Sequence, residues 1–262
     1  METAARVTFV TEFQVVRLGS ATSHHFRVTR TSDRMVKTRI LALETSGMSG
    51  SVAALAGDTL LGELALNPDQ RSARSLAPAI RDLLFQCGWQ AGDVELLAVT
   101  VGPGSFTGLR VGVTTAKTFA YAVGAKAIGL NTLSVVASQV PGDVPGEMLA
   151  VAMDAQRSEL FAATFRRGAA GSMESISEAA IVNRDDWLAS LPVGCLVSGP
   201  ALSKLAEGVP AGRTCVASAF WYPTAAAVGR LAAVRFANGE SDDALRLVPI
   251  YMRRSAAEEK AG

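Results

Sequence analysis

The main body of this 262-residue chain contains no histidine. The two histidines that do occur, His24 and His25, both precede the first convincing core strand. Ser-His and Cys-His nucleophilic schemes are therefore excluded from the body, and so are metal sites built on histidine. Carboxylates, hydroxyls and backbone amides are the groups left for chemistry.

Cysteine, excess charge and long apolar runs are also scarce. Cys87, Cys195 and Cys215 lie far apart without metal-ligand spacing, which favours reduced structural thiols in a cytoplasmic protein. The 25 Lys and Arg against 24 Asp and Glu give a formal charge of +1, so no basic field indicates nucleic-acid binding. Lys117 and Lys126 interrupt the longest apolar candidate, and we expect no membrane span.

Residues 1–34 differ in composition from the rest of the chain, because arginines are scattered among Ser and Thr with few acids and no clear period. We expect a dispensable extension, with Met35 as the natural start. A strand or arm over Val7–Val16 is the alternative. At the other end, residues 255–262 are expected to form a solvated, mobile tail.

From Arg39 the pattern becomes regular and predicts two lobes, residues 35–141 and 142–254, joined at the Pro141–Gly146 loop. The first lobe is expected to contain strands at 39–43, 51–56, 59–66, 95–101 and 127–129 and helices at 72–87, 105–123 and from Asn131 or Thr132. The second is expected to contain strands at 148–153, 159–166, 175–182 and 195–198 and helices near 183–190, 200–207 and 223–238. Each lobe opens with a β-meander and continues in α/β alternation, which indicates a duplicated α/β fold with a ligand cleft between the lobes.

The most informative segment is the glycine-rich stretch from Gly102 to Val113. A buried strand precedes it and a long helix follows, so backbone amides and a helix dipole converge on a tight turn that suits a phosphate. It matches neither the Walker A loop, nor the dinucleotide fingerprint, nor the nucleophile elbow. The alternative is that these glycines only let a strand turn sharply into a helix.

Small residues recur every four positions along that helix, at Gly108, Gly112, Ala116 and Ala120. Such a ridge lets another element approach closely, so we interpret it as a packing surface. The ridge leaves open whether the packing partner belongs to this chain or to another.

Four colinear blocks together resemble the TsaB (YeaZ) family, from about Lys37 to Arg254. They are Ile40–Ser46, Gly102–Val113, Met153–Arg157 and Pro249–Arg253, and the block Gly-Pro-Gly-Ser-Phe-Thr-Gly is the most specific. The resemblance implies an actin/Hsp70/sugar-kinase fold of two ribonuclease-H-like lobes. It also implies a non-catalytic subunit in the synthesis of N6-threonylcarbamoyladenosine at position 37 of tRNA.

The resemblance further implies partners. A TsaD-type threonylcarbamoyltransferase would form a heterodimer with this chain through helices 72–87 and 105–123, a TsaE-type ATPase would complete the system, and tRNA would be reached through the complex. Alone, the chain is expected to form a homodimer. The residues expected at the partner interface are Leu76, Ala79, Ile80, Leu83, Gly108, Gly112, Thr115, Ala116 and Phe119. The alternative is that the apolar positions of these two helices face only their own sheet.

We expect that the chain requires no metal and no cofactor. We also expect that ATP or ADP binds weakly at the partner interface. The residues expected to contact phosphate are Thr45, Ser46, Gly47, Gly102, Gly104, Ser105 and Thr107.

Two departures from the family pattern indicate a poor catalyst. The first strand usually ends in aspartate, whereas here it ends in Glu44, whose extra methylene would misplace a metal-binding carboxylate. Many relatives carry a histidine before the first helix, whereas this chain has Arg71-Ser72-Ala73-Arg74. We therefore expect no catalytic residue in this chain.

The competing hypothesis is an active ATP-dependent kinase or ATPase. Glu44 to Gly47 would contact phosphate and metal, and Asp154 would act as general base; alternatively, Asp154 only caps backbone amides in a turn. A peptidase is the weakest hypothesis, because no activated serine or metal cluster is present. Arg157, Arg253 and Arg254 are candidates for contact with tRNA phosphate or with an acidic patch on the partner, although lone arginines are more often solvated or paired within the chain.

Overall fold

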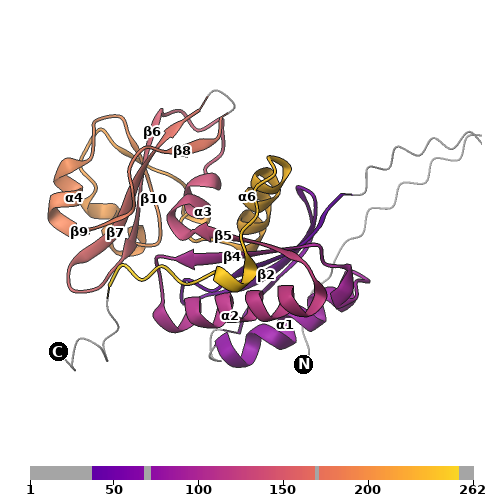
Figure 1. Cartoon of the computed structure of the whole chain (residues 1–262). Coiled ribbons are helices and arrows are strands. Elements are labelled where there is room, and N and C mark those ends of the chain that lie inside the picture. Colours follow the sequence, from indigo (N-terminus) through magenta and orange to yellow (C-terminus); the bar gives the residue numbers. More distant parts are fainter. Residues whose placement is uncertain (1–36, 68–71, 169–170, 254–262) are drawn as a thin grey trace, which may run out of the picture. The chain divides into compact units, whose positions relative to one another are not determined.

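The computed structural model describes residues 37–67, 72–168 and 171–253, so the expected extension at 1–34 and the expected tail at 255–262 lie outside the described residues. These residues form two β-sheets with helices on both faces (Figure 1). The first sheet has the order β3 (Thr59–Ala65), β2 (Ser51–Ala56), β1 (Arg39–Glu44), β4 (Leu96–Gly102), β5 (Lys126–Asn131). The second has the order β11 (Thr214–Cys215), β10 (Leu196–Ser198), β6 (Met148–Asp154), β7 (Glu159–Arg167), β8 (Met173–Ser175), and β9 (Ala180–Asn183) also pairs with β7.

The two sheets share one topology. In the first, β1 pairs antiparallel with β2 on one side and parallel with β4 on the other. In the second, β6 pairs antiparallel with β7 and parallel with β10 in the same way. The prediction of a duplicated α/β fold is confirmed.

The helices begin and end close to the predicted positions. They are α1 (Ser72–Gln86), α2 (Phe106–Val123), α3 (Thr132–Ser138), α4 (Arg184–Ser190), α5 (Leu202–Leu205) and α6 (Ala225–Ala237), with 3-10 turns at 91–93, 206–208, 218–220 and 244–246. The strand predicted at 175–182 is wrong as a single strand. β8 pairs with the end of β7 and β9 with its beginning, so the chain leaves the sheet between them.

The first sheet is covered on both faces because its strands alternate. Leu41 and Leu43 of β1 face the side on which α1 and α2 pack, and Ile40 and Ala42 face α6 on the other side (Figure 1). Helix α6 approaches the sheet closely, since a Cβ at Gly229 would lie 2.2 Å from a methyl carbon of Leu55.

Helix α6, and α3 in part, do not pack as the predicted lobes assign them. Helix α6 is buried against the first sheet, whereas α3 packs on both: Val135 is buried against the first sheet, and Leu133 and Val136 against the second. Helices α4 and α5 cover the opposite face of the second sheet. The sequence pattern placed these helices along the chain but not the sheet that buries each of them. The lobe boundary at residue 141 itself stays a prediction.

The small-residue ridge of α2 packs against the end of β1 in the same chain. A Cβ at Gly108 would lie 2.0 Å from the Thr45 carbonyl oxygen, and one at Gly112 would lie 2.1 Å from Thr45 Oγ1. Thr45 is fully buried, and its hydroxyl has no hydrogen-bond partner among the described residues. An intramolecular contact therefore accounts for the two glycines of the ridge.

This contact predicts that Gly112→Ala destabilises the fold. In an open helix the change would stabilise by about 1 kcal/mol, but a methyl group here overlaps Thr45, and overpacking costs about 1–3 kcal/mol. Urea unfolding should show that Gly112→Ala lowers the free energy of unfolding. Adding Thr45→Ala to this variant should restore most of the lost stability, because it removes the side chain that the new methyl group overlaps. Gly142→Ala, where a Cβ meets nothing within 4 Å, is the control. A Gly112→Ala protein at least as stable as the wild type would contradict the assignment.

Candidate functional site

A cavity of about 830 Å³ lies where the ends of β1, β4 and β6 converge with the C-terminal segment, and we call it the central cavity. Its walls come from the β1–β2 loop, the glycine turn before α2, the β6–β7 turn, residues 200–204 and residues 250–253. Phe106, Phe161, Tyr222 and Tyr251 supply aromatic surface, so the cavity has an apolar side as well as charged ones.

The structure brings together most of the residues predicted to contact phosphate. Those that line the central cavity are Ser46, Gly47, Gly104, Ser105 and Thr107. Thr45 and Gly102 do not line it: Thr45 packs on α2, and Gly102 faces the Ile250 carbonyl oxygen, 2.6 Å from where a Cβ would be.

The glycine turn itself is occupied by contacts within the chain. The Ser105 amide donates to the Ser46 carbonyl oxygen at 2.7 Å, and the Gly108 amide donates to Ser105 Oγ at 3.2 Å. A Cβ at Gly104 would lie 2.4 Å from the Ser46 carbonyl oxygen. Close approach of the β1–β2 loop therefore gives the turn a structural reason for its glycines, and phosphate binding there stays a prediction.

Glu44 lies outside the central cavity, contrary to the kinase hypothesis. It is 0% exposed, and its Oε1 accepts hydrogen bonds from the Ser46 amide at 2.7 Å, from the Ser46 hydroxyl and from Thr100 Oγ1 at 3.4 Å. Its Oε2 has no partner among the described residues. Burial raises the pKa of Glu44 from 4.5 to about 7, while the Ser46 and Thr100 hydrogen bonds oppose that rise. A carboxyl group so enclosed cannot hold a metal ion in the cavity.

Asp154, the predicted general base, does line the central cavity at the end of β6. Its Oδ1 accepts the Gln156 amide at 2.7 Å, as the turn-capping alternative predicts, and its Oδ2 accepts the Lys204 ammonium at 2.8 Å. The hydrogen bond from Lys204 holds the pKa of Asp154 below its usual value. A carboxylate with a lowered pKa is a weak base at neutral pH.

The β6–β7 turn is built from an unusual backbone. Gln156, Arg157 and Ser158 have φ of 65°, 54° and 61°, three successive left-handed residues of which none is glycine. Each such residue costs free energy, and strain of this kind concentrates at functional sites. Sequence reasoning missed this feature because non-glycine residues carry no signal for positive φ.

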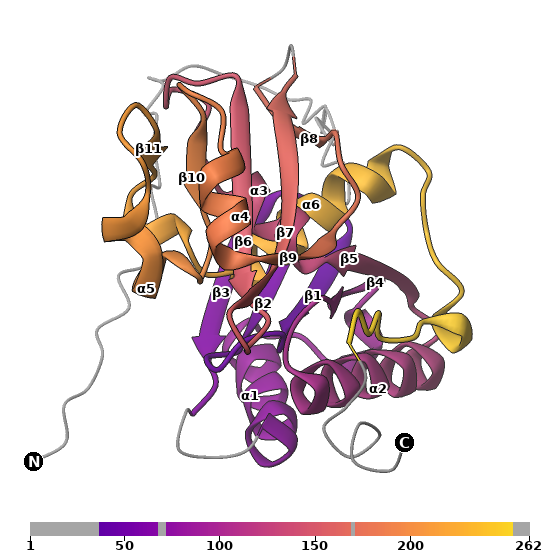
Figure 2. The ribbon, with the colours of Figure 1, turned by 90° about the vertical axis from the view of Figure 1, so that its left-hand side faces the viewer.

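The C-terminal segment, residues 247–253, lies across the glycine turn (Figure 2). The Ile250 amide donates to the Val101 carbonyl oxygen at 2.7 Å, and the Tyr251 ring stacks on Phe106 with centroids 4.5 Å apart. The Arg110 guanidinium lies 4.4 Å from the centroid of the same Phe106 ring.

Arg253 connects this segment to the β6–β7 turn. Its guanidinium donates to the Ala155 carbonyl oxygen and pairs with the Glu159 carboxylate. Arg253 therefore takes part in an intramolecular ion pair, which was the alternative to contact with tRNA. Arg157 lines the central cavity, and Arg254 lies outside the described residues.

Most residues predicted at the partner interface are buried within the chain. Those in the core are Leu76, Ile80, Leu83, Gly108, Gly112 and Ala116. The remaining three, Ala79, Thr115 and Phe119, are half-buried. The outer face of α1 and α2 instead presents Phe85, which is 84% exposed, and Tyr121, which is 74% exposed. The sequence did carry a signal for these two residues, because each is an aromatic residue that lies outside the apolar stripe of its helix.

Metal-binding clusters and membrane-spanning helices are both absent from the described residues. No group of three or more His, Cys, Asp or Glu side chains in this part of the chain could hold a metal ion. None of the helices in residues 37–67, 72–168 and 171–253 combines the length and apolarity needed to cross a membrane.

Burial of Glu44 predicts a pH-dependent stability. Because its pKa is higher in the folded chain, about 7 against 4.5, the folded state holds a proton that the unfolded state releases. The contribution of protonated Glu44 to the free energy of unfolding is fully present below pH 4.5 and is lost as the pH rises to about 7. The loss amounts to about 3 kcal/mol.

Glu44→Gln should remove this loss, because the amide oxygen can still accept the Ser46 hydrogen bonds. Unfolding midpoints of both proteins between pH 4.5 and 8 would test it. The variant should be the more stable protein at pH 8, with the difference shrinking toward pH 4.5. Parallel curves for the two proteins would show that Glu44 does not titrate as its burial implies.

Comparisons with known proteins place this geometry in a family. The family model described as TsaD, tRNA N6-adenosine threonylcarbamoyltransferase, matches residues 61–260. The chain is 28% identical over 228 residues to the tRNA threonylcarbamoyladenosine biosynthesis protein TsaB of Bacillus subtilis, covering 84% of this chain and 96% of that protein. It is 33% identical over 129 residues to the protein of the same name in Escherichia coli, covering 49% and 55%.

The structure agrees with these sequences. YeaZ from Pseudomonas aeruginosa superimposes with a TM-score of 0.70 at 25% identity, covering 82% of this chain and 99% of that one. A second structure from the same organism, described as similar to peptidase YeaZ, gives the same TM-score at 26% identity, covering 82% of this chain and all of that one. The chain therefore belongs to the family that the TsaD model describes, and within it to the TsaB (YeaZ) proteins.

Proposed function

We propose that this chain is a non-catalytic subunit that binds and activates a TsaD-type threonylcarbamoyltransferase in the synthesis of N6-threonylcarbamoyladenosine in tRNA. The names of its relatives support a role in that biosynthesis, and the match to the TsaD model supports a partner of related fold. Two chains of related fold can pair through equivalent helices.

The environments of the Glu44 and Asp154 carboxyl groups support a subunit that catalyses no reaction itself. Phosphoryl transfer needs a metal-binding carboxylate and a base near the phosphate. Glu44 is enclosed in the core, and Asp154 is held by Lys204 with a lowered pKa. Neither is suited to the role that the kinase hypothesis gives it.

The observation that carries the proposal is the outer face of α1 and α2. Phe85 and Tyr121 are large side chains that water reaches almost freely, on helices whose inner faces already fill the core. Aromatic residues are enriched at the centres of protein interfaces. Together with the half-buried Ala79, Thr115 and Phe119 of the same two helices, they support a helix-to-helix interface of about 1,200–2,000 Å².

The other expected partners follow from this complex. We propose that a TsaE-type ATPase joins it, that tRNA is bound through it, and that the same helical face pairs with itself when the partner is absent. Contact of ATP or ADP with the partner interface and a cytoplasmic location stay predictions.

Replacing both exposed aromatic residues should break the complex. Phe85→Ser with Tyr121→Ser is expected to weaken binding to the TsaD-type partner at least tenfold, since an interface hot spot contributes about 2 kcal/mol or more. Analytical size exclusion and titration calorimetry would measure it. Val193→Ser, which removes a 79% exposed apolar side chain elsewhere, is the matched control. Unchanged affinity of the double variant would place the interface elsewhere.

A reconstituted modification assay tests the function directly. Purified TsaD-type and TsaE-type proteins, threonylcarbamoyl-AMP and tRNA are incubated with or without this chain, and the modified nucleoside is measured by mass spectrometry. Product should form only when the chain is added, and Asp154→Asn should leave it unchanged. Equal product without the chain would overturn the proposal and return attention to the kinase hypothesis.

A further inference from the structure

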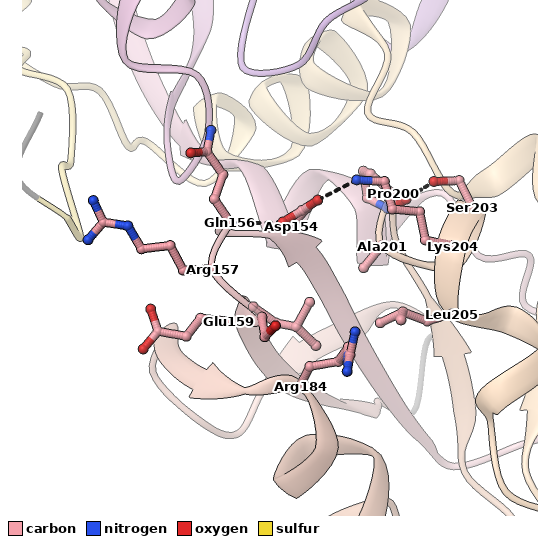
Figure 3. Close-up of a pocket in the computed structure, with 12 residues that line it drawn as sticks. Asp154, Gln156, Arg157, Glu159, Arg184, Pro200, Ala201, Ser203, Lys204 and Leu205 are labelled. Atoms are coloured by element: carbon pink, nitrogen blue, oxygen red, sulfur yellow. Dashed lines mark hydrogen bonds and ion pairs between the residues drawn. The ribbon is translucent and has the colours of Figure 1, made fainter. Parts of the chain in front are cut away.

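A second pocket, of about 440 Å³, lies beside the central cavity and shares part of its wall (Figure 3). It is formed where the parallel strands β6 and β10 end, between the β6–β7 turn and the chain from Pro200 to Leu205. In open α/β sheets, ligands bind outside the carboxyl ends of parallel strands, because the loops there diverge and leave a crevice. The volume falls in the range of small-molecule sites.

Cationic side chains outnumber acidic ones around this pocket. Arg157, Arg184 and Lys204 line it together with Asp154 and Glu159. The Glu159 carboxylate is paired with Arg253 from the C-terminal segment, and the Asp154 carboxylate is paired with Lys204. Arg184 in turn pairs with Asp185. Four cations (Arg157, Arg184, Lys204 and Arg253) against three acids (Asp154, Glu159 and Asp185) give these side chains a formal sum of +1, which favours an anion.

Two of these cations retain donors for a ligand. The Lys204 ammonium carries three N–H groups, and the structure gives one of them a partner, Asp154. Arg184 donates through Nε to Asp185, whereas its two terminal nitrogens have no hydrogen bond among the described residues. Figure 3 shows Lys204 reaching Asp154 across the top of the pocket and Arg184 extending from the start of α4 toward Leu205.

Part of the lining is apolar, because Leu160, Ala201 and Leu205 belong to it. The three-residue left-handed turn also lines the pocket, in a conformation that costs free energy for residues other than glycine. Apolar surface, cationic donors and a strained backbone suit a ligand with a small carbon body and a charged head.

We propose that this pocket binds a small metabolite that carries a carboxylate or phosphate group, with Lys204 and Arg184 contacting the anionic head. The site belongs to this chain alone and does not rest on the proposed function, so either can fail without the other.

The test is titration of the ¹⁵N-labelled full chain with inorganic phosphate and, separately, with citrate, followed by amide chemical shifts. At about 150 mM NaCl the Debye length is about 8 Å, so loose attraction to surface lysines is largely screened. The amides of residues 154–160 and 199–205 should shift saturably with at least one probe. A response to phosphate assigns a phosphate head, and a response to citrate assigns a carboxylate head.

Variants decide whether the named side chains carry the binding. Lys204→Met and Arg184→Met should each weaken it about tenfold, as expected for loss of one charged hydrogen bond. Lys126→Met and Arg246→Met, which remove exposed cations outside the pocket, should leave affinity unchanged, and unfolding midpoints verify that every variant folds. No saturable shift with either probe, or equal affinity of the pocket variants and their controls, would overturn the proposal.

Discussion

The structure depends on two helices through which each half of the chain covers the other half's sheet. Helix α6, near the C-terminus, closes one face of the first sheet, and α3, from the first half of the chain, closes one face of the second. Neither sheet has a complete core without a helix contributed by the other half. Apolar burial, the largest favourable free energy of folding, therefore couples the halves directly.

Hydrogen bonds fix the position of α6 on the first sheet. Its first turn leaves backbone amides without helical partners, and these find acceptors on distant residues. The Ala225 amide donates to Ser51 Oγ at 2.8 Å, and the Ala226 amide donates to Glu63 Oε1 at 3.0 Å. The negative charge of Glu63 also lies at the positive end of the helix dipole. Packing holds the helix to the sheet, and these bonds set its register.

The duplicated topology gives two acidic residues equivalent places with opposite properties. Glu44 ends β1 and Asp154 ends β6, the central strands of the two sheets. Glu44 is turned into the core, where burial raises its pKa, whereas Asp154 faces the cavities, where Lys204 lowers its pKa. One carboxyl group is inaccessible and the other is a weak base. The same topology thus places the acid at the end of each central strand in a different environment, one in the core and one at the cavities.

The sequence by itself determined the elements, since periodicity and the glycine turn placed α1, α2, β4 and β6 within a few residues. It also excluded histidine chemistry from the body. Only the tertiary structure decided which surfaces meet. Gly112 is small because Thr45 of the same chain lies against it, a contact across a sequence separation that local spacing does not encode. The ion pair of Arg253 with Glu159 and that of Lys204 with Asp154 likewise depend on loops brought together by the sheets. The local sequence pattern predicts whether a residue is buried or exposed. Which residue it contacts depends on how the sheets and helices pack.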